Sequence, residues 1–189
     1  MDASRIQSGY LSRDDWAKLH HAAASLSEAP IHVDDSANLT MLQVRAKAQR
    51  LAREHGLDLV VVDYLQLVSG SSRRYENRTQ EVTEISRGLK NLAKELDIPV
   101  IAVSQLNREV EKRSGSKRPQ LSDLRESGSI EQDSDVVLFI SRDDNSASTS
   151  DQEVCDMILG KQRNGMTGDF QLLFKRRVTK FVDLYKENC

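Results

Sequence analysis

The stretch Leu57–Asp63, with the sequence LDLVVVD, decides the fold of this chain. Its apolar residues are consecutive rather than alternating, which is typical of a strand buried on both faces of a parallel sheet. Pro99–Val103 is a second run of this kind, and Val136–Ile140 is a third. A shorter run, Ile31–Val33, precedes the first. Because strands that alternate with helices form right-handed crossovers, the sequence predicts an α/β fold with a parallel sheet.

Apolar periodicity and capping residues predict the helices between these strands. Ser12 begins one helix, which ends before Pro30, and Thr40 begins the next, which ends at Gly56. These residue types satisfy the free amides at a helix start and allow the turn at its end. The range 82–96 carries the apolar face of a third helix. The sequence therefore places a helix before each of the two longer parallel strands.

The last third of the chain predicts antiparallel pairing instead. Glu153–Gly160 and Asp169–Phe174 have strand character and are joined around Asn164-Gly165, a typical hairpin turn. Thr179–Leu184 is a further antiparallel strand. Three polar stretches are predicted as loops: 69–78, 107–119 and Arg142–Asp151. The last of these is expected to be mobile.

The composition limits the class of protein. The chain has 189 residues, of which 38% are hydrophobic and 30% charged, which suits one globular domain spanning 1–189. It contains no apolar run long enough for a bilayer and no signal region, so no membrane partner is expected. Its two cysteines, Cys155 and Cys189, do not form a disulfide framework, which favours a cytoplasmic location. A net charge of −2 argues against coating DNA by bulk electrostatics.

Two polar residues follow the first two long strands. Asp63 ends one strand, and Gln105 follows the next. The carboxyl ends of parallel strands meet at the edge where such sheets bind ligands. A carboxylate there can hold Mg²⁺ through water beside nucleotide phosphates, and an amide can bond to a phosphate or an attacking water. For either residue alone, the plain alternative is a polar group leaving a strand for a loop.

Four segments in order make the pattern specific: Asp63–Leu67, Ser104–Arg108, Asp123–Gln132 and Gly160–Gly165. Together they resemble DnaB-type replicative DNA helicases, and the resemblance covers nearly the whole chain. It implies a RecA-like parallel-core sheet flanked by helices, with a C-terminal antiparallel hairpin and with the N-terminal part of that fold missing.

The resemblance assigns nucleotide roles to five residues. Asp63 matches the Walker B aspartate, which helps to place Mg²⁺, and Gln105 matches a glutamine that couples the nucleotide state to DNA-binding loops. Lys161, Gln162 and Arg163 match a hairpin that reaches the ATP of the neighbouring subunit. Arg163 would then be a catalytic arginine finger that stabilises charge on the transferring phosphoryl group.

The resemblance also assigns a DNA contact. Arg125, Glu126 and Gly128 match a loop that contacts the backbone of single-stranded DNA, and glycine leaves room for close approach. Without the resemblance, Arg125 and Glu126 would be interpreted as solvated surface. Lys161 and Arg163 would be interpreted in the same way, as charges on the exposed face of a strand.

The phosphate-binding loop G-x-x-x-x-G-K-[ST] does not occur in the sequence. The one Gly-Lys pair, Gly160-Lys161, is followed by Gln162. In the family, the Walker A loop and the catalytic glutamate precede the region where this chain begins. We therefore expect a truncation, a split gene or a partial gene model, and no ATPase activity for the isolated chain.

The sequence leaves three functions open. The first is a subunit or fragment of a ring-shaped, hexameric replicative helicase that uses ATP and Mg²⁺ to move along single-stranded DNA. Primase and a helicase loader are its partners by resemblance. The alternative is a non-catalytic remnant that binds helicase rings or single-stranded DNA without turnover. A third, another RecA-like ATPase such as a recombinase, is disfavoured by the segment Asp123–Gln132.

Overall fold

The computed structural model of the chain describes residues 1–70, 77–107, 113, 118–142 and 151–184. It divides into two compact units. The core unit comprises Ser36–Phe139 and Leu159–Gly168, and the terminal unit comprises Met1–Asp35, Ile140–Ile158 and Asp169–Cys189. The loop predicted to be mobile and most of the loop predicted at 107–119 lie outside the described residues.

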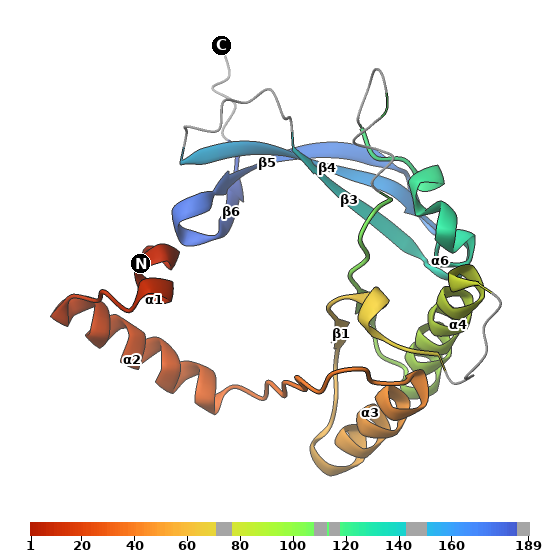
Figure 1. The fold of residues 1–189 in the computed structure, drawn as a ribbon, viewed down its shortest axis with the longest axis horizontal. Coiled ribbons are helices and arrows are strands. Elements are labelled where there is room, and N and C mark those ends of the chain that lie inside the picture. Colours follow the sequence, from red (N-terminus) through yellow and green to blue (C-terminus); the bar gives the residue numbers. More distant parts are fainter. Residues whose placement is uncertain (71–76, 108–112, 114–117, 143–150, 185–189) are drawn as a thin grey trace. The chain divides into compact units, whose positions relative to one another are not determined.

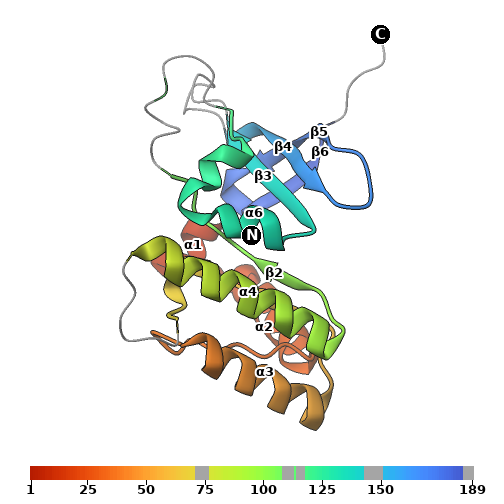
Figure 2. The ribbon, with the colours of Figure 1, turned by 90° about the vertical axis from the view of Figure 1, so that its right-hand side faces the viewer.

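Two parallel strands lie in the core unit. β1 (Val60–Val62) pairs with β2 (Val100–Ala102), and Val61 lies opposite Ile101. The connection between them is α4 (Arg78–Leu96), which packs beside α3 (Met41–His55), as Figures 1 and 2 show. The predicted parallel crossover is therefore confirmed, although both strands are shorter than expected.

Local capping explains where the predicted helices begin and end. The Ser12 hydroxyl accepts from the Asp15 amide, and the Asp15 carboxylate accepts in return from the Ser12 amide, at the start of α2 (Arg13–Glu28). Thr40 and Gln43 form the same reciprocal pair before α3. Gly56 ends α3 at a φ of 80°, which a side chain would disfavour. These helix bounds confirm the sequence predictions.

The apolar face of α4 forms the centre of the core unit. Ile85 and Leu92 are both 0% exposed, and truncating a side chain of this kind typically costs about 2–5 kcal/mol. The buried cluster comprises Met41, Ala48, Leu65, Val68, Val82, Ile85, Leu89 and Leu92. The helix periodicity in the sequence thus identified this core face correctly.

The expectation that the parallel strands are buried on both faces is wrong for the described chain. Val60 and Val62 pack against the helical core. Val61 and Ile101, on the opposite face, are 57% and 52% exposed. The helices of the core unit cover one face of the two-stranded sheet. A run of consecutive apolar residues does not show whether a second layer covers the other face.

A second sheet has the order β3-β4-β5-β6. Its strands are β3 (Val136–Arg142), β4 (Gln152–Gln162), β5 (Gly168–Lys175) and β6 (Lys180–Asp183). β5 and β6 are antiparallel, as the sequence predicts. The third apolar run is a strand, but its burial alternates, because Phe139 is buried whereas Leu138 is 46% exposed. It therefore does not have two buried faces.

The terminal unit contains α1 (Ala3–Ser8), α2 and η3 (Arg176–Val178). Arg177 pairs with Asp2 at 2.9 Å, which fastens the start of α1 to η3. The strand predicted at Ile31–Val33 is absent: these residues belong to no strand, and Val33 is 86% exposed. A run of three residues, of which only Ile31 and Val33 are apolar, forms no strand here because no neighbouring strand pairs with it. Among the described helices, none is long and apolar enough to span a bilayer.

Candidate functional site

Asp63 and Gln105 emerge from the same end of the parallel pair. The Val103 amide donates to the Val62 carbonyl at 2.9 Å, and the Leu65 amide donates to the Val103 carbonyl at 2.8 Å. Backbone pairing therefore continues past the assigned ends of β1 and β2. The predicted juxtaposition of these two residues at one sheet edge has a structural basis in these backbone hydrogen bonds.

Gln66 adds a side-chain link at this edge. Its amide donates to Ser104 Oγ at 3.1 Å and to the Gln105 carbonyl at 3.3 Å. The backbone carbonyl of Gln66 accepts from Arg78 Nη2 at 2.8 Å, at the start of α4. The sequence assigned no role to Gln66, although it lies within a segment that carries the family resemblance. It connects the Gln105 strand end to α4.

The Asp63 carboxylate suits a magnesium ion held through water. Asp63 is exposed, and within the described residues its side chain makes no hydrogen bond or ion pair. The described part of the chain also contains no group of three or more His, Cys, Asp or Glu side chains placed to hold a metal. A Mg²⁺ ion at Asp63 would therefore take its other ligands from water and phosphate oxygens, as Mg²⁺ commonly does.

The segment predicted to contact DNA begins at a buried carboxylate. Asp123 is 6% exposed, accepts from the Gln120 amide at 2.8 Å and pairs with Arg113. It caps η2 (Leu121–Ser127). Its carbonyl accepts from the Asn107 amide at 3.4 Å, two residues beyond Gln105. The strand end that carries Gln105 is thus tied to the start of the predicted DNA loop.

The three predicted DNA contacts lie on consecutive short helices. Arg125 and Glu126 belong to η2, and their side chains are outside what the structure describes. Gly128 begins α6 (Gly128–Asp133) with a φ of −51°, which any residue adopts. A Cβ added at Gly128 would meet nothing within 4 Å. The backbone there is open to close approach, which is compatible with the predicted phosphate contact.

Lys161, at the end of β4, and Arg163, just after it, are held by the last turn of α6 and the two residues that follow it. The Lys161 ammonium donates to the Ser134 carbonyl at 2.7 Å and to the Glu131 carbonyl. Cations at a helix C-terminus stabilise its free carbonyls. The Arg163 amide donates to the Asp135 carbonyl at 2.8 Å, and Arg163 Nη1 lies 3.0 Å from Asp135 Oδ1. Gln162 is exposed between them.

Asp135 and Lys90 are contacts that the sequence reasoning missed. Lys90, on α4, pairs with the second oxygen of the Asp135 carboxylate. That hydrogen bond is the main cause that lowers the pKa of the Asp135 carboxyl, and the charges of Lys90, Arg163 and Lys161 lower it further. On the same helix, Ser86 Oγ donates to Asp133 Oδ2 at 2.8 Å. Two side-chain contacts therefore join α4 to the end of α6 and the residues after it.

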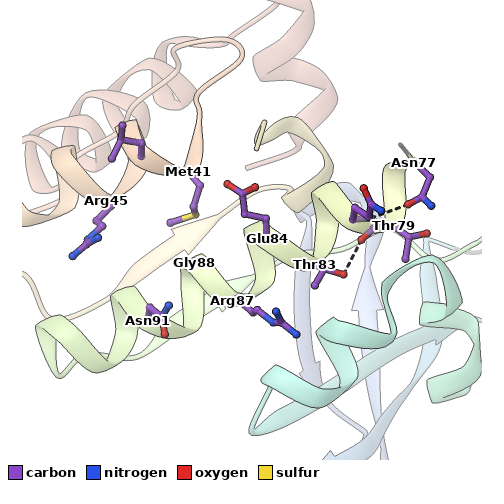
Figure 3. Close-up of a pocket in the computed structure, with 11 residues that line it drawn as sticks. Met41, Arg45, Asn77, Thr79, Thr83, Glu84, Arg87, Gly88 and Asn91 are labelled. Carbon is purple, nitrogen blue, oxygen red and sulfur yellow. Dashed lines mark hydrogen bonds between the residues drawn. The ribbon is translucent and has the colours of Figure 1, made fainter. Parts of the chain in front are cut away.

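A groove of about 640 Å³ lies between α3 and α4 (Figure 3). The Met41 side chain lies against Gly88, since a Cβ added at Gly88 would lie 2.4 Å from Met41 Cγ. The lining of the groove combines the apolar side chains Met41 and Leu42 with polar residues that include Glu84, Arg87 and Asn91. None of the residues predicted to bind nucleotide or DNA lines it. The groove is therefore separate from the candidate site.

Fold and site together define a class. A parallel β–α–β unit with polar residues following the carboxyl ends of its strands is typical of α/β domains that bind a ligand at that edge. The chain belongs to the DnaB-like helicase C terminal domain family, whose profile matches residues 1–183. The resemblance drawn from the four sequence segments is thereby confirmed.

Individual relatives agree with this assignment. The chain is 50% identical over 185 residues to the replicative DNA helicase DnaB of Geobacillus stearothermophilus, covering 97% of this chain and 40% of that relative. It is 48% identical to the replicative DNA helicase DnaC of Bacillus subtilis, with the same coverage of 97% and 40%. The chain thus spans less than half the length of these relatives.

A solved structure supports the RecA-like fold. The structure of a DnaB-like replicative helicase, described with its interactions with primase, has a TM-score of 0.88 and 36% sequence identity to this chain. The match covers 98% of this chain and 45% of that chain. The predicted fold class is confirmed.

Proposed function

We propose that this chain is the part of a ring-shaped replicative DNA helicase that couples ATP hydrolysis to movement along single-stranded DNA and to unwinding of the duplex. A homohexameric ring, primase, a helicase loader and a cytoplasmic location follow from the family as parts of the same proposal. The proposal rests mainly on one contact between the strand end that carries Gln105 and the predicted DNA loop: the Asn107 amide donates to the Asp123 carbonyl.

The chain's own residues divide the work between two sites. At the subunit's own site, Asp63 would hold Mg²⁺ through water, and Gln105 would couple the nucleotide state to the DNA-binding loop. When bound, ATP with Mg²⁺ supplies the phosphoryl group that is transferred to water. At the neighbouring site, Arg163 donates to phosphate oxygens in trans and Lys161 adds a positive charge, with Gln162 beside them.

The DNA side of the proposal rests on η2 and α6. Arg125 contacts the phosphate backbone, and Glu126 and Gly128 shape the loop around it. A phosphate contact carries no base information, so the loop would hold any sequence equally. A change at Gln105 would reach this loop through the connection from Asn107 to Asp123.

The test uses a reconstituted ring, in which this chain is combined with a polypeptide carrying the Walker A half of a DnaB-type helicase. The isolated chain should show no ATPase activity, because it contains no phosphate-binding loop. The reconstituted ring should hydrolyse ATP, and single-stranded DNA should stimulate the rate. Asp63→Asn should abolish most of this turnover.

Asp58→Asn is the matched control, because Asp58 is also an exposed aspartate but precedes β1. It should leave turnover unchanged. Turnover by the isolated chain would contradict the expected need for a Walker A half. Equal effects of the two substitutions would overturn the proposed nucleotide role of Asp63. A co-folded ring that binds single-stranded DNA without hydrolysis would favour the alternative, a non-catalytic helicase remnant.

A further inference from the structure

Asp135 lies where three cationic side chains of the core unit converge. Its Oδ1 is 3.0 Å from Arg163 Nη1, and its Oδ2 pairs with Lys90 of α4. Its carbonyl accepts from the Arg163 amide at 2.8 Å. The Lys161 ammonium binds the carbonyl of the preceding residue, Ser134. One short segment between α6 and β3 thus contacts both cations at the end of β4.

The charge balance gives the Asp135 carboxylate a specific task. Lys90, Lys161 and Arg163 repel one another, and all three lower the pKa of the Asp135 carboxyl. An ionised carboxylate among them reduces this repulsion and lets them stay close together. Neutralising Asp135 would leave Arg163 beside two positive charges, which favours a guanidinium that turns away.

The contact restrains Arg163 more than it stabilises the fold. The side chains of Asp135 and Arg163 are each 53% exposed, and exposed ion pairs typically contribute about 0–1 kcal/mol. Arg163, however, has both its backbone amide and its guanidinium attached to the same residue. A guanidinium has five N–H donors, so one contact with Asp135 leaves several free for phosphate oxygens.

Lys90 restrains the Asp135 carboxylate. Its side chain is 22% exposed, compared with 53% for Asp135, and it belongs to the helix that carries the core residues Ile85 and Leu89. A carboxylate held on one oxygen from a packed helix has less rotational freedom for its other oxygen. Thus α4 positions Lys90, Lys90 restrains the Asp135 carboxylate, and Asp135 in turn restrains the Arg163 guanidinium.

We propose that Asp135 is the positioning residue of the arginine finger, holding the Arg163 guanidinium in place for the nucleotide of the neighbouring subunit, with Lys90 orienting Asp135. This inference rests on the proposed trans role of Arg163. It adds a carboxylate and a lysine, neither of which touches the nucleotide, to the residues that determine turnover.

The kinetic test uses the reconstituted ring. Asp135→Asn should lower kcat on the order of 10- to 100-fold while KM for ATP changes little, because Arg163 is present but misplaced. Asp135→Glu keeps the charge and should restore part of kcat. In an Arg163→Ala ring, Asp135→Asn should cause no further loss, because its effect acts through Arg163. The matched control is Glu54→Gln, which breaks an exposed pair with Arg50 on α3.

A second measurement observes the contact without turnover. In the full chain, NMR signals of the Arg163 guanidinium should show restricted rotation. Asp135→Asn should release that rotation, and Lys90→Gln should release it partly. Unchanged signals in Asp135→Asn would overturn the inference, whatever the kinetics show.

The kinetic outcomes separate this inference from the proposed function. An inactive Arg163→Ala ring beside a fully active Asp135→Asn ring would overturn the positioning role alone. Additive losses in the double variant would overturn it too, because Asp135 would then act independently of Arg163. Normal turnover by the Arg163→Ala ring would overturn the proposed trans role and, with it, the inference.

Discussion

The carboxyl edge of β1 and β2 and the end of β4 hold their functional side chains by different means. At the edge, Asp63 has no side-chain partner among the described residues, and its position comes from the backbone ladder of Val62, Val103 and Leu65. At the end of β4, Lys161 and Arg163 are both bound by other segments. The short Asp63 side chain is therefore positioned by its backbone alone, whereas the long side chains of Lys161 and Arg163 are positioned by contacts with other residues.

Side-chain entropy explains this difference. Fixing a lysine or arginine costs up to about 1.5–2 kcal/mol in lost rotamer freedom, more than fixing the shorter aspartate. A strand end is sufficient to aim a carboxylate that is two bonds from the backbone. A guanidinium reaching across a subunit boundary must also be restrained along its length. The comparison predicts that substitutions at the two places will fail in different ways.

The largest effect is expected at Arg163. Arg163→Ala in the reconstituted ring should remove most turnover, since arginine fingers contribute factors of about 10³ to 10⁵ in rate. Folding and assembly should remain intact, because the pair it forms is exposed. Arg163→Lys should rescue poorly, because an ammonium lacks the planar fork. Steady-state ATPase assays and sizing of the ring measure both properties, and near-normal turnover by Arg163→Ala would leave Arg163 as a surface charge.

The next prediction separates the two places by stability. Lys161→Met removes the donor to the Glu131 and Ser134 carbonyls and should destabilise the chain by about 1–3 kcal/mol. Asp63→Asn should change stability by less than about 0.5 kcal/mol, because the carboxylate is exposed and without a partner in the described residues. Urea unfolding measures both, and equal shifts would contradict the proposed difference in how the side chains are held.

Structural features that depend on residues close together in the sequence were predicted, and those that depend on distant residues were not. The starts of α2 and α3 follow from pairs three residues apart, Ser12 with Asp15 and Thr40 with Gln43, so they were predicted. The exposed face of β1 was not, because burial depends on neighbours that are distant in sequence. The parallel order itself was predictable, since strand and helix periodicities alternate.

The candidate site shows the same limit. The placement of Asp63 and Gln105 at one sheet edge was predictable because strand ends are visible in the sequence, whereas their roles are predictions that rest on the family resemblance. The roles predicted for Lys161 and Arg163 come only from the family resemblance. Asp135 pairs with Lys90, 45 positions away, and is one of 29 acidic residues, so nothing local distinguished it. Long-range side-chain contacts required the structure.

The DNA loop should give a smaller and more uniform effect. Arg125→Ala in the reconstituted ring should weaken single-stranded DNA binding similarly for different sequences. It should also reduce the slope of log affinity against log salt by about 1, as expected when one phosphate contact is lost. Binding titrations at several salt concentrations measure this. Unchanged affinity and slope would show that the contact lies elsewhere.

The smallest effect is expected at Asp2, a short carboxylate that does have side-chain partners. Its pKa is lowered from 3.8 to about 2, first by the Ser4 hydroxyl and then by Arg177. The stability from these contacts is therefore fully present above pH 3.8 and is lost as the pH falls through about 2. An NMR titration of the carboxyl should show a larger rise in pKa for Ser4→Ala than for Arg177→Ala. The reverse order would show that the ion pair dominates.

The central claim, that Arg163 acts across a subunit boundary, is tested most directly by mixing two inactive rings. One ring contains Arg163→Ala, and the other contains a substitution in the Walker A half. Each mixed interface that pairs an intact Arg163 with an intact Walker A segment should regain activity, so the mixture should hydrolyse ATP. If mixed rings are shown to form and turnover remains absent, action in trans at independent interfaces is contradicted.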